Sequence, residues 1–226
     1  MVYPTLVNNL FWIEKNKVLA TKNITPGLTF YKEEVYKEKD TEYRIWNPYK
    51  SKLAAAFLKG LELDVFKDIR KILYLGTSTG TTISHISDII SDDGVIYGVE
   101  VAPRVMLEFI NRVAKYRKNI VPLFFDARTP ELYMDIVEIP IDAVYCDVAQ
   151  PDETKIAADN ADLYLKKNGK IFVAIKARSI DATKPPPVIY ENEARYLRER
   201  GYNVLKIIDL EPYEKDHAMI YAIKIK

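Results

Sequence analysis

Residues 71–82, with the sequence KILYLGTSTGTT, constrain the fold more than any other stretch of the chain. The apolar run 71–75 predicts a fully buried strand of a parallel sheet, and the amphipathic run 80–90 predicts a helix. Between them, Gly76 and Gly80 bracket a loop of small residues. In parallel α/β sheets such a turn holds a nucleotide-like ligand, because glycines let the backbone approach it and the helix N-terminus offers free N–H groups. The alternative is a plain strand–helix turn.

Four further strand–helix pairs follow this one in regular alternation. The predicted strands cover 95–99, 119–125, 141–146 and 170–175, and the predicted helices cover 104–117, 130–137, 152–166 and 187–200. The last two apolar runs, 203–210 and 217–225, are too close in sequence for a parallel crossover, so they predict an antiparallel edge. The pattern predicts an α/β fold with a seven-stranded mixed sheet and helices on both faces, similar to the Rossmann-like fold of class I methyltransferases.

Short β-prone runs dominate residues 1–46. These runs are 10–13, 17–20, 28–31, 33–36 and 42–46. The polar tetrapeptide 14–17 is expected to turn a hairpin between the first two, and a helix with a serine N-cap and a terminal glycine is expected over 51–60. We therefore expect a small N-terminal antiparallel β domain over 1–48, of about four or five strands, packed against a domain with the methyltransferase-like fold over 49–226.

Composition excludes several classes of protein. The net charge is +1, from 33 basic and 32 acidic residues, so any RNA contact must come from local clusters. The single cysteine, Cys146, excludes an intrachain disulfide and fits a reducing compartment, and both Cys146 and His85 are expected to pack in the interior. No stretch approaches roughly 18 apolar residues and no signal-peptide pattern is present, so we expect a cytoplasmic protein without membrane contact.

Ionisable residues follow the predicted strands. Glu100, Asp126, Asp147 and Lys176 each come directly after a strand, and His217 opens the last one. Because ligands bind at the carboxyl ends of strands in such sheets, we expect a site at this edge, where an acid accepts hydrogen bonds from ribose hydroxyls. The alternatives are a solvated acid or helix cap for each carboxylate and an edge histidine for His217. Lys176 is harder to explain this way, because a buried ammonium group is costly unless it is paired.

Five segments resemble the fibrillarin family, whose members are ribose 2′-O-methyltransferases guided by box C/D RNA. The segments are 43–56, 74–90, 146–152, 175–186 and 210–220, in the family's order. The chain is similar to the compact form, which has no Gly/Arg-rich tail. It departs from the family at the GTSTGTT loop, where an Ala-Ser pair is common, and at Cys146, where an acid is frequent.

The resemblance implies S-adenosylmethionine as the methyl donor and no metal. Together with the glycine loop, it implies a donor site lined by Gly76, Gly80, Thr81, Thr82, Glu100, Val101, Asp126, Ala127, Asp147, Val148, Ala149 and Gln150. It also implies that a catalytic group converges in one cleft, made of Lys52, Asp147, Lys176 and His217. In this group Lys176 acts at the 2′-hydroxyl, as a neutral base or a charged orienter, and Asp147 positions it.

The resemblance also implies a ribonucleoprotein. A guide RNA selects the nucleotide in rRNA or tRNA, a Nop5/Nop56/58-type scaffold protein holds the complex, and an L7Ae-type kink-turn protein joins through the RNA. The basic residues Lys50, Lys52, Arg178 and Lys184 are candidates for phosphate contacts, and simple solvation is the alternative for Lys50, Arg178 and Lys184.

Three rival functions remain at this level. The first is a class I methyltransferase that acts on protein or on a small molecule, since a fold alone does not specify a substrate. The second is a non-catalytic subunit that assists assembly of the ribonucleoprotein. The third, an NAD-dependent oxidoreductase, is disfavoured because the glycine spacing is GxxxG rather than GxGxxG.

Overall fold

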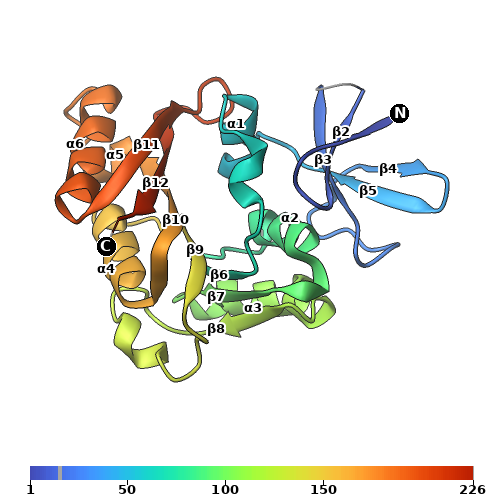
Figure 1. Ribbon diagram of the computed structural model, residues 1–226, viewed down its shortest axis with the longest axis horizontal. Helices are drawn as coiled ribbons and strands as arrows, with labels where there is room; N and C mark the ends of the chain where they lie inside the picture. The colour runs from blue at the N-terminus through green and yellow to red at the C-terminus, as the bar shows by residue number, and fades with distance from the viewer. Residues whose placement is uncertain (15–16, 226) are drawn as a thin grey trace.

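The computed structural model describes residues 1–14 and 17–225 and arranges them around two sheets (Figure 1). The first sheet is antiparallel, in the order β1-β2-β3-β5-β4, with strands β1 (Val2–Pro4), β2 (Leu10–Ile13), β3 (Val18–Lys22), β4 (Val35–Glu38) and β5 (Thr41–Ile45). The second has the strands β6 (Lys71–Leu75), β7 (Val95–Val99), β8 (Ile120–Leu123), β9 (Ile141–Cys146), β10 (Leu165–Lys176), β11 (Tyr202–Asp209) and β12 (His217–Lys224). Its order is β11-β12-β10-β9-β6-β7-β8. Strand β12 runs antiparallel to both neighbours, whereas β10, β9, β6, β7 and β8 pair in parallel.

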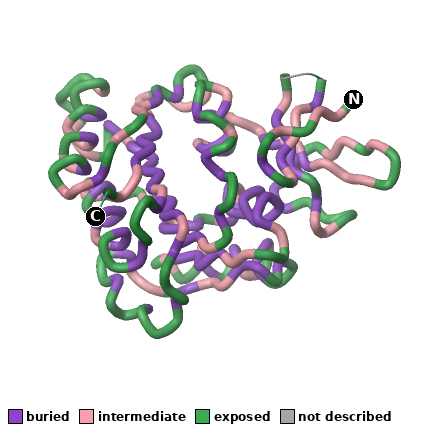
Figure 2. The backbone as a smooth tube through the Cα atoms, in the orientation of Figure 1, coloured by how far each residue is buried: buried purple, intermediate pink, exposed green. Residues whose placement is uncertain are grey.

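Helices cover both faces of the second sheet. One face is covered by α1 (Lys52–Leu58), α2 (Thr81–Ile90) and α3 (Pro103–Arg112), and the other by α4 (Glu153–Tyr164), α5 (Ala177–Ile180) and α6 (Pro186–Glu199). Alternate residues of β6 enter the two cores, so that Ile72 and Tyr74 face the first set of helices while Leu73 and Leu75 face the second. Figure 2 shows the buried residues concentrated along these strands and on the inner sides of the helices. The predicted fold class is confirmed.

Within the described residues, no helix combines the length and the apolarity that crossing a bilayer requires.

Several elements end earlier than their sequence patterns predicted. The helix expected over 104–117 stops at Arg112 and continues as the short 3-10 helix η3 (Ala114–Tyr116), and the helix expected over 130–137 is the single 3-10 turn η4 (Pro130–Tyr133). Strand β8 ends at Leu123 and contains Pro122, which lacks an N–H group and is tolerated because β8 lies at the edge of the sheet.

The N-terminal hairpin pairs as expected. Strands β2 and β3 are antiparallel, with Ile13 opposite Val18. The turn predicted over 14–17 includes residues 15 and 16, which lie outside the described residues. Strand β1, which pairs with β2, was not predicted from the sequence.

The strand predicted over 28–31 is wrong. The carboxylate of Glu33 accepts hydrogen bonds from the backbone N–H groups of Phe30, at 3.1 Å, and Tyr31, at 2.8 Å. Amides that point at a carboxylate cannot also join a sheet ladder, so this segment forms a compact loop whose two aromatic side chains are buried.

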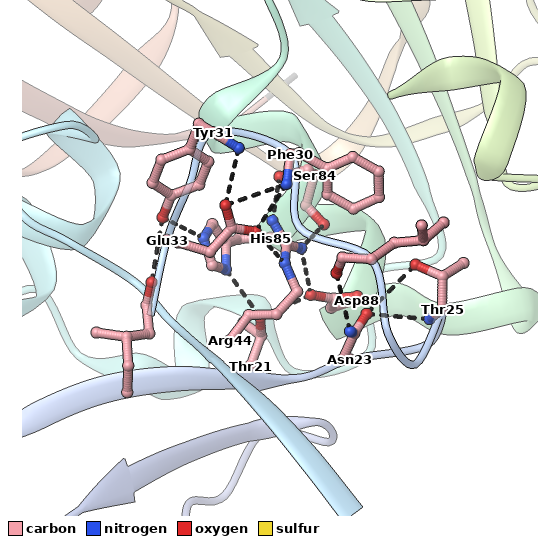
Figure 3. Close-up of polar contacts among 12 residues, drawn as sticks. Thr21, Asn23, Thr25, Phe30, Tyr31, Glu33, Arg44, Ser84, His85 and Asp88 are labelled. Carbon is pink, nitrogen blue, oxygen red and sulfur yellow. Dashed lines mark hydrogen bonds and ion pairs between the residues drawn. The ribbon is translucent and has the colours of Figure 1, made fainter. Parts of the chain in front are cut away.

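A buried ion-pair network joins the N-terminal sheet to α2 (Figure 3). Arg44 of β5 contacts Asp88 of α2 at 2.7 Å and Glu33 at 2.6 Å. The second oxygen of Asp88 lies 2.6 Å from Nη1 of Arg117. The side chains of Arg44, Asp88 and Arg117 are fully buried, and that of Glu33 is 1% exposed. Two cations and two carboxylates therefore balance each other where an unpaired charge would be costly.

His85 of α2 is anchored in the same interface. Its Nδ1 lies 2.8 Å from Oγ1 of Thr21, and its Nε2 lies 2.7 Å from the hydroxyl of Tyr31 (Figure 3). Burial lowers the pKa of His85 well below its usual range, and the charges of Arg44 and Arg117 lower it further. His85 is therefore a neutral packing residue, as expected from the sequence.

We predict that Asp88→Asn lowers the free energy of unfolding by about 3–5 kcal/mol, because two buried guanidinium groups then face a single carboxylate. Chemical denaturation measures the change. The control is Glu191→Gln, which breaks an exposed 2.6 Å pair with Arg198 and should cost about 1 kcal/mol or less. Equal losses in the two variants would contradict the role assigned to the network.

Candidate functional site

A cavity of about 500 Å³ lies at the carboxyl ends of the parallel strands. The sheet register explains its position, because Leu75 at the end of β6 pairs with Val99 at the end of β7 and with Cys146 at the end of β9. The loops that follow these three strands therefore begin side by side at the same edge of the sheet. The cavity is lined by Lys50, Lys52, Tyr74, Gly76, Thr77, Ser78, Thr81, Thr82, Val99, Glu100, Val101, Ala102, Val105, Phe125, Asp126, Ala127, Arg128, Asp147, Val148, Ala149, Gln150, Ile156 and Lys176.

The two glycines of the first loop serve different purposes. Gly76 has a φ of +81°, and a Cβ added there would lie 2.7 Å from the backbone oxygen of Asp147 on the neighbouring strand end. Gly80 has a φ of +98°, and an added Cβ would lie 2.5 Å from Val113 and 2.9 Å from Phe109. Gly76 lines the cavity and Gly80 does not. Packing against the α3 region accounts for Gly80, whereas the sequence suggested a close approach to a ligand.

The Glu100 carboxylate organises the rim of the cavity. Its Oε2 accepts the N–H of Ser78 at 3.0 Å, and its Oε1 accepts the N–H groups of Val101 and Ala102, also at 3.0 Å. One side chain thus joins the glycine loop to the loop after β7. These three hydrogen bonds hold the loops together through the Glu100 carboxylate. The carboxylate still lines the cavity, where a hydroxyl group can donate a further hydrogen bond to it.

Arg128 joins the loops after β8 and β9. Its backbone N–H donates to Oδ1 of Asp126 at 2.9 Å, and its Nη2 donates to Oε1 of Gln150 at 2.6 Å. An ion pair at 3.3 Å connects the same guanidinium to Asp152. Arg128 therefore holds together Asp126 and Gln150, both of which were proposed from the sequence.

Two lysines from distant parts of the chain share the carboxylate of Asp147. Nζ of Lys52 lies 3.1 Å from Oδ2, and Nζ of Lys176 lies 3.1 Å from Oδ1. Nζ of Lys176 also donates to the backbone oxygen of Val148 at 3.3 Å. The three ionisable side chains are only 15–17% exposed. The cluster carries one excess positive charge in a partly desolvated setting, which suits it to orient a polar nucleophile or an anionic group.

Lys52 is the first residue of α1, so the N-terminal cap of this helix fixes its position. Ser51 is the N-cap, and its Oγ accepts the N–H of Ala54 at 3.4 Å, as the sequence predicted. The same hydroxyl lies 2.9 Å from Oγ1 of Thr82, which lines the cavity from α2. The end of α1 that carries Lys52 is thus tied to the helix that follows the glycine loop.

His217 lies beside this group but outside the cavity. It stands opposite Lys176 in the β10–β12 register, and its Nδ1–H donates to the backbone oxygen of Lys215 at 2.6 Å. The structure therefore brings Lys52, Asp147 and Lys176 together in the cavity and puts His217 on the adjacent strand.

Several cavity side chains carried no signal in the sequence. Tyr74, Val105, Phe125 and Ile156 supply apolar or aromatic wall, and each lies in an ordinary core pattern or just after it. Among the described residues, no group of three or more His, Cys, Asp or Glu side chains is arranged to hold a metal ion. The cavity combines hydroxyl acceptors, backbone N–H groups and an apolar wall, which fits an adenosine-bearing ligand.

The chain is similar in sequence to proteins of known family. The family model described as Fibrillarin matches residues 2–226. A fibrillarin-like rRNA/tRNA 2′-O-methyltransferase of Staphylothermus marinus is 52% identical over 204 residues, which cover 90% of this chain and 86% of that protein.

Two solved structures are similar over nearly the whole chain. The first is a fibrillarin of Aeropyrum pernix in complex with natively bound S-adenosyl-L-methionine, with 45% identity, a TM-score of 0.87, and coverage of 98% of this chain and 97% of that one. The second is a fibrillarin/Nop5p complex, with 36% identity, a TM-score of 0.87, and coverage of 98% and 100%.

We predict that Gly76→Ala destabilises the protein more than Gly27→Ala does. Both glycines have positive φ, +81° and +85°, but a Cβ at Gly27 meets nothing within 4 Å. The shared backbone strain costs about 1–2 kcal/mol, and the clash with Asp147 adds roughly 1–3 kcal/mol for Gly76 alone. Thermal unfolding of the two variants measures the difference, and equal melting temperatures would rule out the close approach.

Proposed function

The chain belongs to the fibrillarin family, and we propose that it transfers a methyl group from S-adenosylmethionine to ribose 2′-hydroxyl groups of RNA. The observation that carries this proposal is the Lys52–Asp147–Lys176 cluster, which lies in the same cavity as the residues suited to an adenosine moiety. A donor and an acceptor bound in one cavity are in reach of each other, which is the main requirement for direct transfer.

The donor site is supported by the cavity's chemistry. Glu100 presents a carboxylate to ribose hydroxyls, and the backbone and side chain around Asp126 are available to an adenine edge. Val101 and Phe125 provide an apolar wall for a planar ring. When bound, S-adenosylmethionine supplies an electrophilic methyl group on a sulfonium. A fibrillarin that is 45% identical to this chain was solved with that molecule natively bound.

In the proposed mechanism, the lysine cluster prepares the acceptor. A ribose hydroxyl is a weak nucleophile, so it must be aligned with the methyl group. Its proton leaves as the oxygen–methyl bond forms, to the amine of Lys176 where that group is neutral, or to solvent where Lys176 is an ammonium group that only orients the hydroxyl. We assign Lys176 Nζ to contact this hydroxyl. Asp147 accepts a hydrogen bond from Lys52 at 3.1 Å and forms an ion pair with Lys176, also at 3.1 Å. In this proposal the ion pair draws Lys176 Nζ toward the hydroxyl, and Lys52 balances the carboxylate from the other side. We keep His217 in this group as the residue paired with Lys176 across the sheet.

We predict that Lys176→Ala and Asp147→Ala each reduce methyl transfer by about 100-fold or more, because general acid–base assistance and orientation are lost. Binding of S-adenosylmethionine, measured by calorimetry, should change little for Lys176→Ala. Transfer of labelled methyl to RNA, with the product mapped to the 2′-oxygen, provides the assay, and the exposed Lys118→Ala is the control.

Turnover close to that of the unaltered protein in both variants, with intact donor binding, would rule out this assignment. Label recovered on protein or on a small molecule would favour the rival methyltransferase functions.

We further propose that the RNA is rRNA or tRNA selected by a box C/D guide, with a Nop5-type scaffold and an L7Ae-type kink-turn protein completing the complex. The net charge of +1 provides little attraction for RNA by itself, so selection by a guide and partners is the simpler arrangement. A fibrillarin that is 36% identical to this chain was solved in complex with Nop5p. Lys50, which is exposed and lines the cavity, is placed to meet a phosphate near the target nucleotide.

We predict that stable assembly on guide RNA requires the scaffold protein. Gel-shift titration with guide and target RNA should show a complex when the chain is mixed with the scaffold and kink-turn proteins, and no site-selective complex with the chain alone. Tight and site-selective binding by the isolated chain would overturn the proposed division of labour.

A further inference from the structure

We infer that Glu153 is a positioning residue that holds together the two strand ends carrying Asp147 and Lys176. Glu153 is the first residue of α4, and it is fully buried. Its Oε1 accepts the backbone N–H of Lys176 at 2.7 Å. Its backbone oxygen accepts the thiol of Cys146, the residue before Asp147, at 3.6 Å. The inference rests on the proposed function, because it assigns Glu153 a part in the same reaction.

The sheet shows why a side chain is needed at this point. Pairing between β9 and β10 ends at Val173 opposite Cys146, after which the chain leaves β9 for the loop 147–152. Strand β10 continues to Lys176 and has lost its neighbour on that side. The Glu153 carboxylate substitutes for the missing strand by accepting the Lys176 amide. This hydrogen bond thereby fixes the backbone position of Lys176, from which its Nζ reaches Asp147.

The second carboxyl oxygen of Glu153 bears on the charge of this side chain. Oε2 of Glu153 is buried and has no hydrogen-bond partner among the described residues. Leaving such an atom unsatisfied is costly, and the cost is larger for a charged carboxylate than for an uncharged carboxyl group. The sequence offered no signal for Glu153, since an acid in the first turn of a helix is ordinary.

The electrostatic setting keeps Glu153 uncharged at neutral pH. Burial raises the pKa of Glu153 to about 8, although the Lys176 amide and ammonium lower it in part. The carboxylates of Asp147 and of Glu193 on α6 raise the pKa further. A neutral Glu153 does not compete with Asp147 for the Lys176 ammonium, and it still accepts the amide hydrogen bond.

The sign of the pH effect follows from this pKa. Between the ordinary carboxyl value near 4.5 and the folded value of about 8, the folded protein binds more protons than the unfolded chain. Stability therefore falls as the pH rises through this range. Glu153→Gln has no carboxyl group to titrate at this position, so this decline is absent in the variant. The melting temperature of the variant minus that of the unaltered protein should therefore be larger at pH 9 than at pH 5.

The test compares two substitutions in the full complex. Glu153→Gln keeps an acceptor for the Lys176 amide, and its single-turnover rate at pH 7 should stay within about threefold of that of the unaltered protein. Glu153→Leu is similar in volume and removes the acceptor, so its rate should fall about tenfold or more while the Kd for S-adenosylmethionine stays the same. Glu131→Gln, an exposed acid on η4, is the control. If Glu153→Leu fails to fold, Glu153→Asp replaces it, since its carboxylate is one methylene too short to reach the amide.

An unchanged rate in Glu153→Leu or Glu153→Asp, with Lys176→Ala inactive, would overturn this inference and leave the proposed function intact. Equal losses in Glu153→Gln and Glu153→Leu would also overturn it, as would a melting-temperature difference that does not vary with pH. An inactive unaltered complex would instead contradict the proposed function.

Discussion

The arrangement of the site depends on the two ion pairs that the Asp147 carboxylate forms. The carboxylate receives Lys52 from the helix that follows the N-terminal sheet and Lys176 from the end of β10, each at 3.1 Å. One carboxylate between two ammonium groups is a strong constraint, because moving any member leaves a partly desolvated charge without its partner. This charged cluster and the loops that leave the strand ends thus line the same cavity.

The backbone around Asp147 is constrained as tightly as its side chain. Its N–H donates to the backbone oxygen of Leu75 at 2.9 Å, and its own backbone oxygen leaves no room for a side chain at Gly76. Gly76 is thus needed for the fit between β6 and β9, which in turn sets the position of the Asp147 carboxylate. Strand packing by itself therefore requires a glycine at position 76, beside the cavity.

The N-terminal sheet contributes to the site indirectly. Its buried Arg44 pairs with Asp88 on α2, and α2 begins at the cavity with Thr81 and Thr82. The chain then passes from this sheet to Ser51 and Lys52, where the Ser51 hydroxyl meets Thr82. Both connections end on α2, so the position of Lys52 relative to the glycine loop is set from two directions.

Local pattern was sufficient for the alternating strands and helices, the N-cap at Ser51 and the run of charged residues after the strands, because side-chain periodicity and capping depend on neighbours in sequence. The family resemblance, read from the same residues, added the donor and the four proposed catalytic residues. The sequence could not show that His217 stands on the strand beside the cavity-lining residues, assign Gly80 to packing, or find the contacts made by Glu153 and Arg128. It also could not foresee that Glu33 removes the segment 28–31 from a sheet. These features arise where residues far apart in sequence meet, and only the register of the sheet and the packing of the helices on it decide which of them do.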